Sequence, residues 1–128
     1  MLALTRRLVA FAAFATAAAL AASAQAEKKY DTGATDTEIK MGNIMPYSGP
    51  ASSYGVIGLT EKAYFDMVND QGGINGHKIK FITYDDGYSP PKAIEQARKL
   101  VESDEVFLIF ASLGTAPNAA IQKYMNAK

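Results

Sequence analysis

The stretch Gly72-Gly-Ile-Asn-Gly-His-Lys-Ile-Lys-Phe-Ile-Thr-Tyr-Asp-Asp-Gly-Tyr-Ser-Pro-Pro91 joins the end of one predicted helix to the start of another. Its initial glycine pair is typical of a helix end, because glycine readily adopts the left-handed conformation found there. Residues 78–84 alternate in polarity and predict a strand with Ile79 and Phe81 on one side. Pro91 suits the first turn of the next helix, where no backbone donor is needed. The stretch therefore predicts a helix–strand–helix unit.

The same alternation of strands and helices continues on both sides of this unit. Residues 38–45 predict a first strand, and residues 52–71 carry apolar side chains at helical spacing. After a helix predicted at 92–102, Val106-Phe-Leu-Ile-Phe110 is a continuous apolar run that predicts a strand covered on both faces. A third helix is predicted at 118–126. This order implies parallel strands joined by right-handed crossovers.

The apolar stripes of the first two predicted helices indicate which residues should face the sheet. They are, in chain order, Ile57, Ala63, Tyr64, Phe65, Met67, Val68, Ile94, Ala97, Leu100 and Val101. The predicted fold class is α/β, with three strands and three helices that form part of a doubly wound parallel sheet. Roughly 100 mature residues are few for such a sheet, so the chain is expected to be a fragment or a truncated reading frame.

The N-terminal segment has the pattern of a secretory signal peptide. Arg6-Arg7 precede the uncharged, alanine-rich stretch 8–22, and Ala24-Gln25-Ala26 is a typical cleavage site. The alternative, a membrane anchor, needs a span of about 20 strongly apolar residues. Residues 1–26 are therefore expected to direct export to the periplasm and to be removed. The general secretory route is the default, with twin-arginine export as the alternative, and residues 27–37 should form a flexible leader.

The composition of the mature chain excludes several classes of function. The whole sequence has 13 basic and 13 acidic residues, and the signal peptide removes only two arginines, so the mature net charge is −2. No basic face indicates a nucleic acid or an anionic membrane as partner. Without cysteine, and with His77 as the single histidine, neither a disulfide nor a metal site is expected. No second long apolar run predicts a membrane-spanning segment in the mature protein.

Three loops leave the carboxyl ends of the predicted strands, where open parallel α/β sheets bind ligands. We name them the first loop (residues 46–53), the second loop (85–90) and the third loop (111–117). The first loop is rich in hydroxyls, rings and open backbone, and it is followed by Tyr54. For Tyr54 the alternative is an aromatic side chain that packs half-buried on the sheet.

In the third loop, Ser112-Leu113-Gly114-Thr115 places free backbone amides and two hydroxyls at a helix N-terminus. That arrangement favours a carboxylate or phosphate, because the first-turn amides lack intrahelical acceptors and the helix dipole is positive there. The alternative is that Thr115 simply caps its helix.

The sequence contains no recognisable catalytic arrangement. Asp85 and Asp86 leave a strand as neighbours and should point to opposite sides, which favours turn formation over acid–base catalysis. Residues 72–76 have neither the dinucleotide-binding spacing nor a P-loop lysine. Ser48 and Ser112 lack a nucleophile elbow and a partner histidine. We therefore expect no enzyme activity and no cofactor.

Four motifs resemble the leucine/isoleucine/valine-binding protein family, which serves ABC importers. They are Tyr47-Ser-Gly-Pro50, Tyr54-Gly55, Asn69-Asp-Gln-Gly-Gly-Ile-Asn-Gly76, and Tyr84-Asp-Asp86 with Pro90. The resemblance extends from about residue 39 to the end. It implies that residues 38–128 form an incomplete N-terminal lobe of a type I periplasmic solute-binding protein, with a small solute and a membrane permease as partners.

The resemblance also implies ligand-binding residues. The cleft-lining tyrosine of the family matches Tyr54, the loop that holds an amino acid's carboxylate matches residues 111–115, and Tyr47 and Ser48 come from the first motif. Here Ser-Leu-Gly-Thr-Ala-Pro replaces the family's serine run, so an amide, a urea-like compound or an aromatic acid is an alternative to an α-amino acid. We expect the fragment alone to bind poorly and to aggregate through its unpaired sheet edge.

Two other functions stay open from the sequence alone. A flavodoxin-like redox module is one alternative, because residues 48–53 could wrap a phosphate at a helix start. A sensory ligand-binding ectodomain is the other, and it would need a transmembrane helix downstream.

Overall fold

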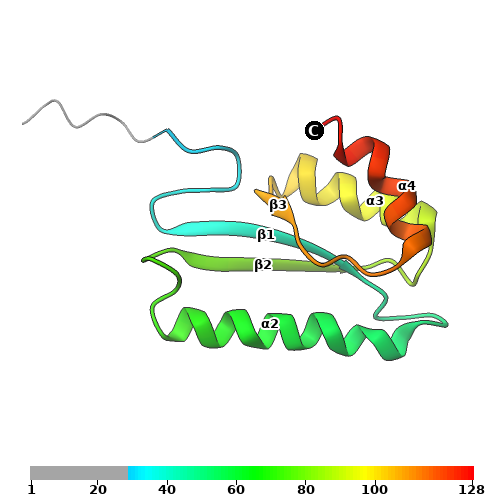
Figure 1. The fold of residues 1–128 in the computed structure, drawn as a ribbon, viewed down its shortest axis with the longest axis horizontal. Coiled ribbons are helices and arrows are strands. Elements are labelled where there is room, and N and C mark those ends of the chain that lie inside the picture. Colours follow the sequence, from blue (N-terminus) through cyan, green and yellow to red (C-terminus); the bar gives the residue numbers. More distant parts are fainter. Residues whose placement is uncertain (1–28) are drawn as a thin grey trace, which may run out of the picture.

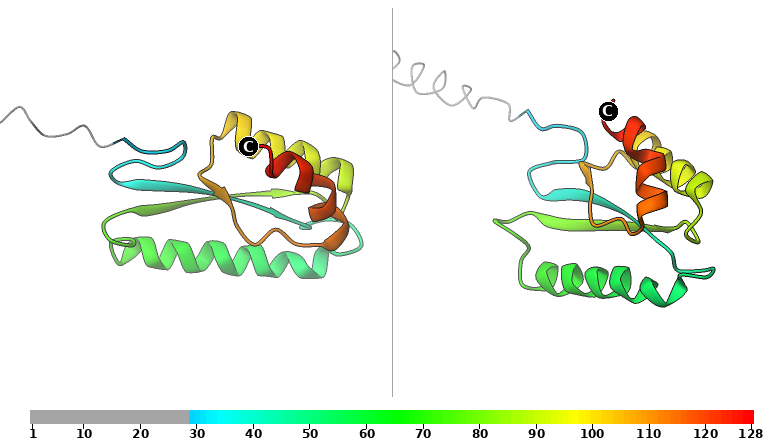
Figure 2. Two further views of the ribbon diagram at one scale, coloured as in Figure 1. Left: turned by 45° about the horizontal axis from the view of Figure 1, so that its top comes forward. Right: turned by 45° about the vertical axis from the view of Figure 1, so that its right-hand side comes forward.

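The structure is a computed structural model that describes residues 29–128, so the signal peptide predicted at 1–26 lies outside the described residues. Three parallel strands form one sheet in the order β2-β1-β3. The strands are β1 (Glu38–Met45), β2 (Lys78–Asp85) and β3 (Leu108–Ile109), and the helices are α2 (Gly55–Asp70), α3 (Pro90–Arg98) and α4 (Thr115–Met125). Helix α2 covers one face of the sheet, while α3 and α4 lie on the other (Figures 1 and 2). The predicted α/β class and strand order along the chain are confirmed.

Strands β1 and β2 pair over their whole length, and this register decides which side chains meet. Asn43 lies beside Thr83, and Met45 lies beside Asp85. Because side chains alternate between the two faces of a strand, all four belong to the face that α2 covers.

Helix α2 begins with a short 3-10 turn, Ser52–Tyr54, and ends where the sequence predicts. Gly72 and Gly73 have φ of 105° and 83°, so the glycine pair adopts the left-handed conformation. The predicted apolar stripe is only partly correct, because Phe65 is buried whereas Tyr64 and Met67 are 57% and 47% exposed. Ile57 is also exposed. The apolar stripe of α2 is therefore wider than the part of the helix that packs against the sheet.

A tight turn at Asn75-Gly76 connects α2 to β2. Asn75 and Gly76 both have positive φ, 51° and 84°, and Ile74 pairs with His77 in a single antiparallel bridge. The Asn69 side chain then anchors the strand, because its amide donates to Ile79 O and its oxygen accepts from Ile79 N. The tight turn therefore leads the chain directly into β2.

The main apolar core lies on the face covered by α3 and α4. Its buried members are Ile44, Ala93, Ala97, Leu100, Val106 and Ile121. Helix α3 continues from Lys99 to Ser103 as a wider π turn that keeps Leu100 in this core. The inward position predicted for Ile94 is wrong, because this side chain is 37% exposed.

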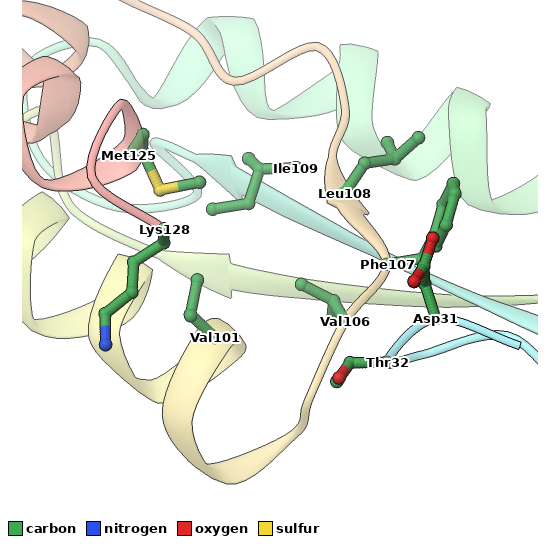
Figure 3. Close-up of a pocket in the computed structure, with 9 residues that line it drawn as sticks. All are labelled: Asp31, Thr32, Val101, Val106, Phe107, Leu108, Ile109, Met125 and Lys128. Carbon is green, nitrogen blue, oxygen red and sulfur yellow. The ribbon is translucent and has the colours of Figure 1, made fainter.

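The predicted third strand differs most from the structure. Only Leu108 and Ile109 form β3, and the predicted coverage on both faces is wrong, because Phe107 and Leu108 are 46% and 40% exposed. In the described residues β3 is an edge strand that pairs with β1 alone. A pocket of about 640 Å³ lies beside it (Figure 3), lined by Asp31, Thr32, Val101, Val106, Phe107, Leu108, Ile109, Met125 and Lys128.

The described part of the predicted leader, residues 29–37, folds back along β1. Ala34 forms an antiparallel bridge with Ile39, and Lys40 N donates to Gly33 O at 2.8 Å. Gly33 lies so close to the chain before β3 that a Cβ there would be 2.2 Å from Phe107 N. The boundary of this segment as a separate leader stays a prediction.

Candidate functional site

The three loops meet at the carboxyl edge of the sheet, at the right-hand end of Figure 1. The first and second loops touch, because a Cβ on Gly49 would lie 2.8 Å from Gly87 O. The second and third loops touch through Tyr88, whose ring lies against Gly114. The third loop is tied to β1 by the hydrogen bond from Leu113 N to Ile44 O at 3.1 Å.

The Asp85 carboxylate joins the first loop to the second. Its Oδ1 accepts hydrogen bonds from the amides of Tyr47, Ser48 and Gly87 at 2.8, 3.0 and 2.9 Å. Its Oδ2 accepts a hydrogen bond from Ser48 Oγ at 2.5 Å. Burial of the Asp85 carboxyl favours its neutral form, but these hydrogen bonds outweigh burial and lower the pKa of Asp85. An ionised Asp85 therefore fixes the start of the first loop.

The Asn43 side chain connects β1 to the start of the third loop by hydrogen bonds. The residue is 0% exposed, and its Nδ2 donates to Phe110 O at 3.0 Å and to Ala111 O at 3.3 Å. Its Oδ1 accepts from Thr83 Oγ1 at 2.7 Å. Asn43 Nδ2 also donates to Glu61 Oε2 at 3.3 Å, and burial raises the pKa of Glu61. Sequence reasoning missed this residue, although a lone amide inside an apolar strand is a usable signal.

The first-loop candidates have different environments. Tyr54 is 55% exposed at the end of the 3-10 turn, so the half-buried packing considered for it is not observed. Tyr47 is half-buried instead: its ring lies against Gly55 and Gly58 of α2, and its hydroxyl is 2.6 Å from Thr83 Oγ1. Ser48 is exposed, but its hydroxyl is bonded to Asp85. Tyr54 is therefore the ring among these candidates that is most accessible to a solute.

The third loop differs in two details from the prediction. Helix α4 begins at Thr115, and Gly114, with φ of 110°, occupies the cap position, so Thr115 does not cap the helix. The amide of Leu113 is not free, because it donates to Ile44 O. The amides of Thr115 and Ala116 lack intrahelical acceptors, whereas Pro117 has no amide hydrogen and Asn118 N donates to Gly114 O.

Ser112 is held at the base of α4. Its carbonyl accepts a hydrogen bond from Asn118 Nδ2 at 2.8 Å, and Asn118 N donates to Gly114 O at 3.0 Å. The Ser112 hydroxyl is buried and has no hydrogen-bond partner among the described residues. Ser112 also lines a hollow of about 450 Å³ beside α4. A buried hydroxyl without a partner is uncommon in a folded protein and needs an explanation, such as an ion or water bound beside it.

Tyr88 is a further residue at this edge that the sequence did not indicate. It has φ of 61°, uncommon for a bulky residue, and its side chain is 37% exposed. Backbone strain of this kind often accompanies functional sites. The turn that contains Tyr88 is closed locally, because Ser89 N donates to Asp86 O at 2.9 Å and Tyr88 N donates to Asp86 Oδ1.

Asp86 has an environment opposite to that of Asp85. It is 0% exposed, its Oδ1 accepts from Tyr88 N at 2.8 Å, and its Oδ2 has no partner among residues 29–128. Burial raises the pKa of Asp86, and the neighbouring Asp85 charge adds to this effect. The two carboxyls thus accept hydrogen bonds from different groups: Asp85 from the first loop and Gly87, and Asp86 from Tyr88. In the described part of the chain, no group of three or more His, Cys, Asp or Glu side chains could hold a metal ion.

Comparison with known proteins identifies the family. Residues 38–128 match the sequence profile of the periplasmic binding proteins. The chain belongs to this family. The match does not support the flavodoxin-like alternative.

Several individual periplasmic binding proteins are similar in sequence. The Leu/Ile/Val-binding protein of Escherichia coli K12 is 34% identical over 88 residues, which cover 66% of this chain and 24% of that protein. An amino acid binding protein of Pseudomonas aeruginosa is 31% identical over 90 residues, with the same coverage of 66% and 24%. The chain therefore spans about a quarter of the length of these curated relatives.

Solved structures of periplasmic binding proteins match the fold. A fatty acid ABC transporter substrate-binding protein from Thermomonospora curvata has a TM-score of 0.68 and 28% identity, with 77% of this chain and 25% of that chain covered. A solute-binding protein from R. palustris in complex with benzoate has a TM-score of 0.57 and 28% identity, with 68% and 24% covered. Within residues 29–128, no helix has the length and hydropathy that a bilayer span requires.

Proposed function

We propose that this chain is the first part of a periplasmic solute-binding component of an ABC importer. It captures a small solute at the carboxyl edge of its sheet and delivers it, chemically unaltered, to a membrane permease. The observation that carries this proposal is the convergence of three strand-end loops on the N-terminus of α4. Open parallel sheets bind ligands at this edge.

The proposed ligand carries a carboxylate. The first-turn amides of α4, the positive end of its dipole and the partnerless Ser112 hydroxyl all favour an anion. The names of the relatives support the same group, because leucine, isoleucine, valine, fatty acids and benzoate all bear a carboxylate. Branched-chain or other amino acids and aromatic acids are therefore the first solutes to test, and amides are the alternative.

Each candidate residue has a proposed role. Ser112, Gly114 and Thr115 receive the carboxylate, and Leu113 shapes the loop that carries them. Tyr54 offers an accessible ring to the rest of the solute. Tyr47 and Ser48 act mainly by holding the first loop in place, because their polar groups are engaged with Thr83 and Asp85.

The proposed mechanism is closure of two lobes around the solute. This lobe holds the solute weakly, and a second lobe completes the contacts. The resemblance to type I periplasmic solute-binding proteins supports this division. The periplasmic location is supported by the family and by the predicted signal peptide.

A nuclear magnetic resonance titration of the purified chain tests the proposal. We expect leucine or benzoate at millimolar concentration to shift the amide signals of residues 112–116 and Tyr54 in a saturable way. Leucinamide and benzamide, which lack the carboxylate, serve as controls and should shift them far less. The carboxylate proposal is wrong if acids and amides act equally, and the solute-binding proposal is wrong if neither class changes these signals.

A further inference from the structure

The Asp85 carboxylate accepts more hydrogen bonds than a simple turn requires. One bond, from Gly87 N at 2.9 Å, closes its own loop. The other three come from the first loop, namely from Tyr47 N, Ser48 N and Ser48 Oγ. Hydrogen bonds to an ionised acceptor are about twice as strong as those between neutral groups. Asp85 therefore ties two loops that are far apart in the sequence.

Tyr47 connects these hydrogen bonds of Asp85 to strands β1 and β2 of the sheet. Its amide is bonded to Asp85, while its hydroxyl lies 2.6 Å from Thr83 Oγ1. Thr83 in turn donates to Asn43 Oδ1 at 2.7 Å, and Asn43 Nδ2 holds the carbonyls of the third loop's start. A continuous set of hydrogen bonds thus runs from the second loop, through the first, to the third.

The last residue in this series of hydrogen bonds, Ala111, has a strained backbone conformation. Ala111 has φ of 50°, and its carbonyl accepts from Asn43 Nδ2 at 3.3 Å. A conformation of this kind persists only where the surroundings over-determine it. Ala111 immediately precedes Ser112, so the position of the proposed carboxylate cradle depends on these contacts.

We propose that Asp85 is a positioning residue for the solute site. It touches no solute in this account. Its negative charge holds the first loop in place. Through Tyr47, Thr83 and Asn43 it also fixes the third loop relative to the first, so that both loops contact the same solute. The effect on solute affinity rests on the proposed function, whereas the effect on loop order does not.

The test compares three variants of the whole chain. Asp85→Ala removes every acceptor, and Asp85→Asn keeps one oxygen acceptor without the charge. Asp66→Asn is the matched control, because Asp66 is exposed on α2 and pairs only with Lys62 among the described residues. If Asp85→Ala fails to fold, Ser48→Ala removes a single bond to the same carboxylate and replaces it in the comparison.

Amide hydrogen exchange without solute is the first readout. In Asp85→Ala we expect amide exchange at Ser48 and Gly87 to become at least about tenfold faster. The effect at Tyr47 should be smaller, because Tyr47 N also donates to Met45 O at 3.0 Å. The exchange rates of Asp85→Asn should lie between those of Asp85→Ala and those of the unaltered chain. The exchange rates of Asp66→Asn should equal those of the unaltered chain. Gly73, which donates to Val68 O at the other end of α2, should exchange at the same rate in all of them. Unchanged exchange at Ser48 and Gly87 would overturn the positioning role.

Solute affinity is the second readout. We expect Asp85→Ala to weaken binding of leucine or benzoate about tenfold, with the shifts at residues 112–116 reduced, although Asp85 itself is not in the third loop. Faster exchange with unchanged affinity would overturn the link to the solute site. If the unaltered chain binds none of these acids, the proposed function fails, and the exchange rates still decide whether Asp85 positions the loops.

Discussion

Tyr88 lies against Gly114 so closely that a Cβ on Gly114 would be 2.6 Å from Tyr88 Cε2. This contact joins the second loop to the residue that caps α4. Position 114 requires glycine for two reasons. Its φ is 110°, and the Tyr88 ring occupies the space that a Cβ would need. The edge at which we propose solute binding is therefore closely packed before any solute arrives.

Gly114→Ala should lower the free energy of unfolding by about 1–3 kcal/mol from backbone strain, with a further loss from overlap with Tyr88. Urea unfolding measures the change. Gly72→Ala is the matched control, because Gly72 has a similar φ of 105° but no atom within 4 Å of an added Cβ. Equal losses in the two variants would show that the Tyr88 contact contributes nothing.

Gly58→Ala should destabilise the chain although alanine is the better helix former by about 0.8–1.0 kcal/mol. A Cβ on Gly58 would lie 2.3 Å from the Tyr47 hydroxyl, and we expect a net loss of about 1–3 kcal/mol. Tyr47→Phe removes that oxygen, so Gly58→Ala should cost less in this background. A stabilising Gly58→Ala, measured by thermal unfolding, would contradict the observed packing of α2.

Asn43→Ala should lower the free energy of unfolding by about 2–3 kcal/mol, because it removes a fully buried amide and its part-buried hydrogen bonds to Thr83, Phe110 and Ala111. Asn126→Ala, at the exposed end of α4, should change stability by less than about 0.5 kcal/mol. Chemical denaturation compares the two. A loss at Asn43 no greater than at Asn126 would exclude a structural role for the buried amide.

The adjacent carboxyls should give opposite responses to substitution. The pKa of Asp85 is lowered in the folded chain, so its stabilisation is present above the unfolded pKa of about 3.9 and is lost as the pH falls through the folded value. Asp85→Asn should therefore be destabilising at pH 7 and nearly neutral in strong acid.

The pKa of Asp86 is raised by burial, so its favourable neutral form is fully present below the unfolded value and is lost as the pH rises through the folded one. Asp86→Asn should be stabilising at pH 7, and the gain should vanish in acid. Urea unfolding of both variants between pH 2.5 and pH 7 checks these signs. If both substitutions changed the free energy of unfolding at pH 7 in the same direction, the predicted contrast between Asp85 and Asp86 would be wrong.

The sequence predicted the elements that local patterns control. The alternation at 38–45 and 78–84 and the glycine pair after α2 gave β1, β2 and the end of the helix within a residue or two. Ile57, Tyr64 and Leu108 were expected to be covered and are exposed. Periodicity reports which residues are apolar, but it does not report how much of the neighbouring surface is there to cover them.

The candidate site could be predicted only in outline. Strand order placed the three loops at one edge, and the family resemblance selected Tyr54 and residues 111–115. The contact of Tyr88 with Gly114 and the hydrogen bonds of Asn43 join segments far apart in the sequence. No local pattern contains that information.

A paramagnetic carboxylate locates the place on the chain at which a solute binds. A nitroxide ring bearing a carboxylate broadens the amide signals of residues within its reach, and the matching nitroxide amide is the control. We expect the acid, and not the amide, to broaden Ser112, Gly114, Thr115 and Tyr54 selectively, while residues 72–77 at the opposite end of the sheet stay sharp. Broadening confined to the pocket beside β3, or equal broadening along the whole chain, would contradict solute binding at the strand-end loops.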